Sequence, residues 1–155
     1  MRFELIDRIL ELSSGERIVA VKAVSLAEEY LSDHFPTFPV LPGVLMLEAF
    51  TQAAAWLVRE AQDFSSGVNL LRYARNVTYR SFVKPGNLLR VEILCRRLAR
   101  DDSDFEGIGY CNQEEAVRAK FGLMHFSPRR DGAEQAAMDQ QLVAQARARF
   151  AFLRQ

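Results

Sequence analysis

The sequence is poor in the features that assign a protein to a specialised class. Its 155 residues include two cysteines, Cys95 and Cys111, too few for a disulfide framework or a zinc site built from cysteines. Twenty basic and twenty acidic side chains cancel, so the overall basic charge typical of nucleic-acid-binding proteins is lacking. The longest apolar stretch, residues 35–58, contains three prolines and several polar side chains, which excludes a membrane span. The first residues lack the basic-then-apolar layout of a secretion signal.

We therefore expect a cytoplasmic protein that binds neither nucleic acid nor membrane. Apolar residues make up 49% of the chain and charged residues 26%, which is the balance of a globular domain rather than of a disordered chain. The length predicts one domain, or one domain with an appendage. A break over residues 127–132 precedes an amphipathic helix over 133–153. We expect this helix to dock on the domain or on a partner subunit.

One segment predicts a buried helix, and most of the rest predicts strands. Residues 44–61 are apolar nearly all round, so a helix here must be buried on most faces. A strand is expected over residues 17–24, whereas residues 5–12 fit either a helix or the partner strand of a hairpin. Four more strands are expected over 75–83, 88–97, 105–111 and 116–126. This order indicates an α+β fold in which an antiparallel sheet wraps around a central helix.

Glu48 is the anomalous residue of the apolar helix. An unpaired buried carboxylate costs several kcal/mol, so a carboxyl in such surroundings is either protonated or held by hydrogen bonds. Gln52 follows four residues later on the same face, where its amide can orient the carboxyl. Taken alone, Glu48 is more simply a solvated or hydrogen-bonded structural residue.

His34 stands in a stiff loop that runs directly into this helix. Prolines at positions 36, 39 and 42 fix their own φ angles, and a rigid loop holds an imidazole in one place, as proton transfer requires. Gly43, at the start of the helix, would offer an unpaired backbone N–H to an incoming carbonyl oxygen. A lone loop histidine is usually structural, and this setting is what favours a catalytic role.

This stretch resembles the signature of the (3R)-3-hydroxyacyl-acyl-carrier-protein dehydratases of type II fatty-acid synthesis. The resemblance is carried by His34-Phe35-Pro36, Pro39-Val40, Pro42-Gly43-Val44-Leu45, Glu48-Ala49 and Gln52, and it extends over about residues 3–126. It implies a hot-dog fold over residues 1–127, with residues 128–155 as a helical extension. It also implies a homodimer, often assembled into a trimer of dimers, with each active site shared between two subunits.

The resemblance assigns roles to the same residues. His34 would be the base that removes the C2 proton of a 3-hydroxyacyl thioester, and Glu48 of the other subunit the acid that protonates the departing hydroxyl. Gly43, Val44 and Gln52 would bind substrate, Gly43 through its N–H. The substrate would be carried by acyl carrier protein, and neither a metal nor a redox cofactor is implied. Tyr73, Tyr79 and the aromatic residues Phe38, Trp56 and Phe82 are candidates for the core or for the lining of an acyl tunnel.

Three positions depart from the family pattern. Asp33 and Thr37 stand where the family has glycines on either side of the His-Phe-Pro triplet, and Asn87 stands where it has Asp. Because glycine adopts positive φ readily and these residues do not, the loop geometry is expected to differ. None of the three changes removes a catalytic group.

Two other functions remain open at this point. The first is a non-catalytic hot-dog subunit that binds acyl chains or a partner, against which the retention of His34, Gly43 and Glu48 counts. The second is a thioesterase on the same fold, which would need a carboxylate-activated water at the thioester carbon. The resemblance favours elimination over hydrolysis, and the glutamate at position 48 favours dehydration without double-bond isomerisation.

Charge is unevenly distributed along the predicted strands. Residues 72–100 hold eight basic side chains and one acidic side chain, whereas residues 101–115 hold six acidic side chains and no basic one. The simpler interpretation is that these are the solvent-facing sides of strands and an acidic turn. The alternative is a basic surface, including Arg96 and Arg97, that binds the acidic carrier protein.

Overall fold

The N-terminal segment left open by the sequence forms the first strand of a hairpin. The computed structural model describes residues 3–127 and 133–155. Strand β1 (Arg8–Ser13) pairs antiparallel with β2 (Arg17–Ala23), and Ile9 and Ile18 point into the core. The turn between them contains Gly15 with a φ of 68°, a conformation that glycine adopts without steric cost.

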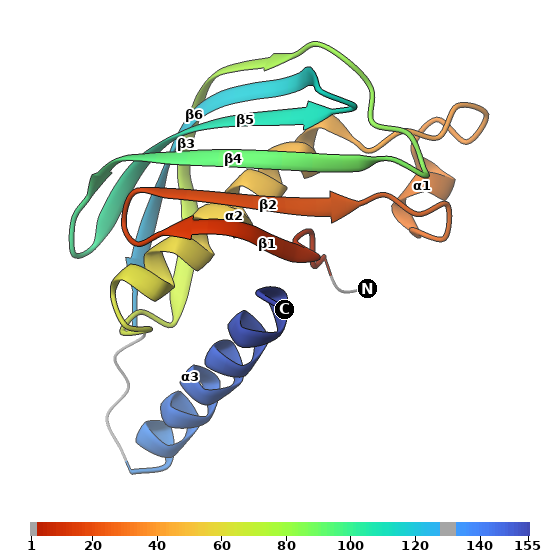
Figure 1. The fold of residues 1–155 in the computed structure, drawn as a ribbon. Helices are drawn as coiled ribbons and strands as arrows, with labels where there is room; N and C mark the ends of the chain where they lie inside the picture. The colour runs from red at the N-terminus through yellow and green to blue at the C-terminus, as the bar shows by residue number, and fades with distance from the viewer. Residues whose placement is uncertain (1–2, 128–132) are drawn as a thin grey trace.

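Six antiparallel strands form one sheet in the order β1-β2-β4-β5-β6-β3 (Figure 1). Strands β4 (Leu88–Leu98), β5 (Asp102–Cys111) and β6 (Glu114–Phe126) confirm three predicted strands within a few residues. A two-residue turn at Asn112 and Gln113, both with positive φ, joins β5 to β6 and matches the twist of the hairpin.

The prediction of a strand over residues 75–83 is wrong at both ends, because β3 spans Val68–Tyr79. Strand β3 lies at the edge of the sheet and is exposed along most of its length, so it lacks the alternation of apolar and polar residues on which the prediction depends. Residues 80–83 leave the ladder instead. There the Val83 carbonyl accepts a hydrogen bond from the Leu41 N–H (2.8 Å), which ties this segment to the proline loop.

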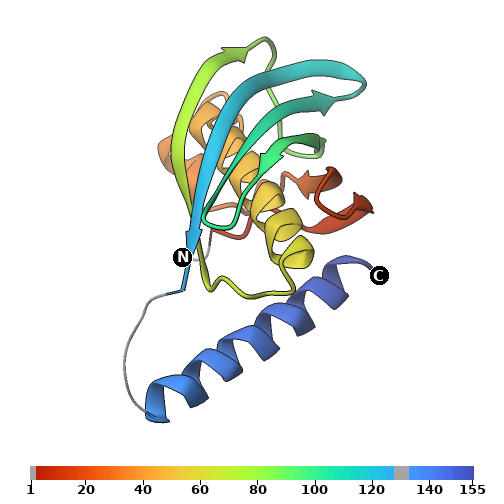
Figure 2. The same ribbon diagram turned by 90° about the vertical axis from the view of Figure 1, so that its left-hand side faces the viewer.

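Helix α2 (Gly43–Ala61) occupies the hollow of the sheet, as its all-round apolar sequence predicts (Figure 2). Its central residue Phe50 is fully buried and packs against Phe121 of β6, with ring centroids 6.1 Å apart. A Cβ atom at Gly107 of β5 would lie 2.5 Å from the Phe50 ring, so glycine is required where helix and sheet approach each other. This arrangement is the predicted hot-dog fold.

Helix α3 (Ala133–Leu153) has the bounds expected from the sequence, and its last turns dock on the body of the protein. Leu153 is buried, and the Phe150 ring packs against Trp56 of α2 with a centroid distance of 5.9 Å. The first turns of α3 extend away from the sheet (Figure 2), and Met138 is 56% exposed. The break predicted before this helix falls mostly on residues 128–132, outside the described residues. None of the helices in the described parts of the chain is long and apolar enough to span a bilayer.

Candidate active site

The loop that carries His34 begins at a short helix, α1 (Tyr30–Asp33). His34 follows it in an extended conformation and is half-buried, and its ring centroid lies 4.5 Å from that of Phe35. The left-handed backbone conformation in this loop falls on Phe35 (φ 50°), and the Phe38 N–H closes a turn on the Phe35 carbonyl (2.8 Å). Asp33 and Thr37 therefore do not need the positive φ that would have made them unfavourable in place of glycine.

The loop ends at the first turn of α2. The Gly43 N–H is the first of this helix, and the first N–H groups of a helix have no acceptor within it. A Cβ atom at position 43 would lie 2.9 Å from the ring of Tyr79 on β3, so glycine lets this ring lie against the start of the helix. Burial raises the pKa of the Tyr79 hydroxyl. Val44 is 71% exposed and points away from the core.

Glu48 and Gln52 are in contact on one face of α2, as their spacing predicts. Gln52 Nε2 donates a hydrogen bond to Glu48 Oε1 (2.9 Å), and both side chains are half-buried. The same amide nitrogen donates to the carbonyl of Phe3 (2.7 Å), and Gln52 Oε1 accepts from the Leu5 N–H (2.8 Å). These two contacts from the N-terminal segment have no signal in the sequence, because they join backbone groups to a side chain more than forty residues away.

Within the described residues, no hydrogen bond or ion pair joins His34 to Glu48. The two residues flank the start of α2, His34 on the proline loop and Glu48 on the second turn of the helix.

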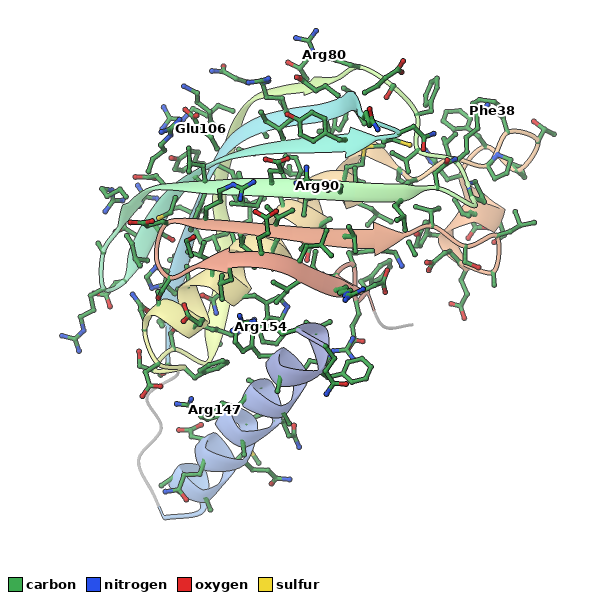
Figure 3. All side chains as sticks on the ribbon, viewed as in Figure 1. Phe38, Arg80, Arg90, Glu106, Arg147 and Arg154 are labelled. Carbon is green, nitrogen blue, oxygen red and sulfur yellow. The ribbon has the colours of Figure 1, made fainter. Side chains whose placement is uncertain are left out.

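Large apolar side chains stand exposed around the His34 loop. Phe38 (44% exposed) and Phe82 (63%) meet edge-to-face at 5.6 Å, and neither is part of the core to which the sequence could have assigned them. Figure 3 shows Phe38 on the far side of the molecule from Arg147 of α3 and from Arg154, which follows that helix. Apolar side chains exposed together in this way make the loop a candidate interaction surface.

The remaining candidates have structural surroundings. Burial raises the pKa of both thiols, Cys95 and Cys111, which disfavours the reactive thiolate. His125 is buried on β6, and the Tyr73 hydroxyl donates to Asp104 (2.6 Å). No group of three or more His, Cys, Asp or Glu side chains in the described part of the chain could hold a metal ion.

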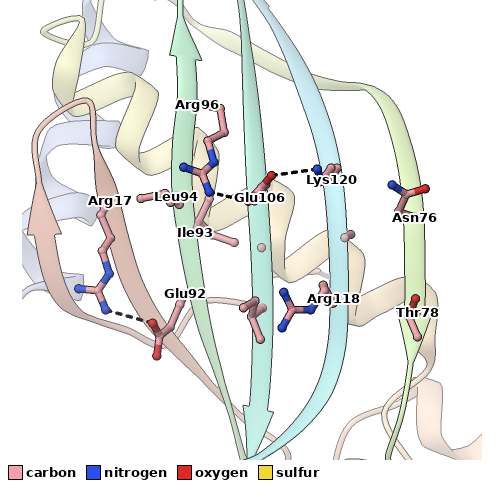
Figure 4. A pocket seen from close by; sticks show the side chains of 13 residues that line it. Arg17, Asn76, Thr78, Glu92, Ile93, Leu94, Arg96, Glu106, Arg118 and Lys120 are labelled. Carbon is pink, nitrogen blue, oxygen red and sulfur yellow. Dashed lines mark hydrogen bonds and ion pairs between the residues drawn. The ribbon is translucent and has the colours of Figure 1, made fainter.

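The basic stretch of the sequence is largely neutralised by the acidic stretch that follows it. Arg97 forms ion pairs with Asp102 (2.8 Å) and Asp104 (2.7 Å) across neighbouring strands. The Arg97 guanidinium lowers the pKa of Asp102 to about 2. A groove of about 500 Å³ on the outer face of the sheet is lined by further such pairs (Figure 4), among them Arg96–Glu106, Lys120–Glu106 and Arg17–Glu92. The paired arginines favour the simpler interpretation, the solvent-facing side of a sheet.

Comparison with known proteins identifies the family to which this fold and loop belong. Residues 1–120 match the model of the FabA-like domain. The 3-hydroxyacyl-acyl-carrier-protein dehydratase FabZ of Rhizorhabdus wittichii is 37% identical over 129 residues, 82% of each chain. That of Symbiobacterium thermophilum is 40% identical over 124 residues, 79% of this chain and 87% of the relative.

Solved structures share the fold at lower identity. A chain of the dehydratase heterocomplex ApeI:P from Xenorhabdus doucetiae superposes with a TM-score of 0.65 at 19% identity, covering 88% of this chain and 89% of its own. At this identity the likeness concerns the fold alone, whereas the two sequence relatives and the family model match most of the chain. The chain belongs to the FabA-like family of 3-hydroxyacyl-acyl-carrier-protein dehydratases.

Proposed function

We propose that this protein dehydrates (3R)-3-hydroxyacyl thioesters on acyl carrier protein to trans-2-enoyl thioesters, with His34 as base and Glu48 as acid. The observation that carries the residue roles is the Glu48 carboxyl on a largely apolar helix, held by Gln52 and preceded by the rigid loop of His34. The names of the two relatives state the substrate class. A dehydratase of this kind would serve fatty-acid synthesis or a related lipid or polyketide pathway.

The reaction needs a base at C2 of the substrate and an acid at the hydroxyl on C3. Neutral His34 takes the C2 proton, the C2–H electron pair forms the C2=C3 double bond, and the C3–O bond breaks. Glu48 gives its proton to the departing hydroxyl, which leaves as water. Gln52 occupies Oε1 of Glu48, so Oε2 is the oxygen available for that proton. The Gly43 N–H faces the negative charge that develops on the thioester oxygen.

We propose that two copies of the chain complete each site, His34 from one and Glu48 from the other. The supporting observation is strand β3, a long edge strand with exposed Leu70 (48%) and Leu71 (40%). The opposite edge of the sheet, β1, is half as long, and a short edge strand is a device that limits edge pairing. A homodimer that joins two β3 strands would cover this edge and the apolar cluster around the loop.

The boundaries of the catalytic unit form part of the same proposal. Residues 1–127 would make up the dehydratase domain, and residues 128–155 would be an extension, because the family match ends at residue 120. The acidic carrier protein would approach the His34 loop, where Lys84 lies 4.6 Å over the Phe38 ring and forms no ion pair with any described residue.

The test combines two inactive variants. His34→Ala and Glu48→Gln should each lower kcat for hydration of a crotonyl thioester on carrier protein by about 10²–10⁴-fold, the range for a lost general acid or base. After subunit exchange, an equal mixture should regain roughly a quarter of wild-type activity, since half of randomly formed dimers carry one intact His34–Glu48 pair. Near-full activity in either single variant would refute its role, and a mixture without recovery would refute the shared site.

A further inference from the structure

The amide of Gln52 is fixed by the N-terminal segment, and this segment is in turn held by α3. The Gln52 oxygen accepts from the Leu5 N–H, and its two amide protons go to the Phe3 carbonyl and to Glu48. All three contacts depend on one orientation, because a flipped amide would turn its oxygen toward a carbonyl and a carboxylate. The position of residues 3–5 therefore decides whether Gln52 can hold Glu48.

Leu5 is buried, but Phe3 and Glu4 lie on the surface. Arg149 of α3 reaches this exposed part, and its Nη2 lies 2.9 Å from Glu4 Oε2. Helix α3 is itself anchored one residue further on by Phe150, which packs against Trp56 and Phe64. The ion pair thus joins an anchored helix to the segment that holds Gln52.

We propose that α3 positions the Glu48 carboxyl through the Arg149–Glu4 ion pair and the N-terminal segment. Arg149 and Glu4 are positioning residues, since neither touches Glu48. Helix α3 lies outside the part of the chain that matches the family, so this device belongs to the extension rather than to the shared domain. The inference rests on the proposed function of Glu48 as the acid.

Helix α3 offers a matched control. Arg147 Nη2 lies 2.7 Å from Asp63 Oδ1 and also ties α3 to the body, but Asp63 follows the end of α2, and no hydrogen bond or ion pair joins it to the N-terminal segment among the described residues. Arg149→Glu places like charges on α3 and at residue 4, whereas Arg147→Glu does the same at Asp63. Arg147 also donates to the Asp63 carbonyl and lies over the Phe64 ring, so a purely structural role of α3 would make Arg147→Glu at least as damaging as Arg149→Glu.

The experiment measures steady-state hydration of a crotonyl thioester on carrier protein with the full-length chain. Arg149→Glu should lower kcat about tenfold with little change in KM, because small displacements of a catalytic group are costly. Arg147→Glu should keep kcat within about twofold of wild type. The exchange Glu4→Arg with Arg149→Glu should restore the rate, and Glu4→Gln should show a smaller loss in the same direction.

Each other outcome overturns the inference. It is wrong if Arg149→Glu retains wild-type kcat, if Arg147→Glu loses as much, or if the exchanged pair does not recover. It is also wrong if the loss in Arg149→Glu appears only in KM or is matched by a drop in unfolding temperature. Glu48→Gln runs beside these variants: if it is inactive while Arg149→Glu is fully active, the proposed function stands and only the positioning role fails.

Discussion

The outer face of the sheet and the region around the His34 loop differ in whether their side chains have partners within one copy of the chain. On the outer face, charged groups are paired across strands, as in Arg97 with Asp102 and Asp104 or Arg96 with Glu106. Around the loop, Phe38 and Phe82 are exposed, and the edge strand β3 begins a sheet that another strand could continue. The charged side chains of the outer face thus have partners within one copy of the chain, whereas the two rings beside the loop and the edge of β3 are exposed.

Under the proposed function, this difference separates the paired charges of the outer face, which take no part in the reaction, from the groups around His34. A surface ion pair contributes little to stability, and its presence in a charged stretch of sequence carries no functional signal. Phe38 and Phe82, by contrast, are apolar rings exposed together near a half-buried histidine, which makes them a candidate interaction surface. Under the proposed function, the second copy and the substrate would lie at this loop and at the edge of β3.

The largest effect on activity should come from a charge on the edge strand β3. Leu71→Lys places a cation on β3, and a charge on an edge strand opposes pairing with another strand. We expect a monomer by light scattering and a loss of activity by about 10²–10⁴-fold, as for a missing acid or base.

Leu10→Lys is the matched variant on the other edge of the sheet, where Leu10 on β1 is 45% exposed. It should leave the oligomeric state and kcat unchanged. A dimer that persists in Leu71→Lys, or dissociates in Leu10→Lys, would show that β3 is not the interface.

A smaller effect is expected where α3 docks on the body of the protein. Phe150 packs against Trp56 and Phe64 and is partly buried, so Phe150→Ala should lower the free energy of unfolding by about 2–3 kcal/mol, somewhat less than for a fully buried Phe. Phe152, on the same helix but 59% exposed, gives the control, with Phe152→Ala changing it by less than about 0.5 kcal/mol. Urea unfolding at one fixed protein concentration measures both, and equal losses would mean that α3 does not dock through Phe150.

The sequence predicts those features that depend on local periodicity. The helix of residues 44–61, the strands β4 to β6 and the contact between Glu48 and Gln52 all follow from spacings of two or four residues. Strand β3 was misplaced because both of its faces are exposed, which removes the alternation.

Contacts between distant parts of the chain could not be predicted in this way. The Arg149–Glu4 pair joins residues 145 positions apart, and the ion pairs of the outer face depend on strand register. Neither leaves a repeating pattern in the sequence. The motif around His34 points to the proposed site, whereas the backbone groups that hold Gln52 beside Glu48 appear only once the chain is folded.

The smallest effect is expected on the outer face of the sheet, where the charges are paired. The pKa of Asp102 is lowered from 3.8 to about 2, chiefly by its hydrogen bond from Arg97. Because the folded-state pKa lies below the unfolded value, the native state binds fewer protons near pH 3, so the stability from this pair is present above about pH 4 and is lost as the pH falls toward 2. Arg97→Gln should therefore lower the unfolding temperature slightly at pH 7, and this difference from wild type should shrink as the pH falls below 4 and vanish only below about pH 2. Added salt should shrink the difference at pH 7, because it screens interactions between exposed charges. Carrier-linked turnover should stay unchanged, because the charges of this face are paired within one copy of the chain. A large loss of turnover in Arg97→Gln would instead place the carrier protein on this face.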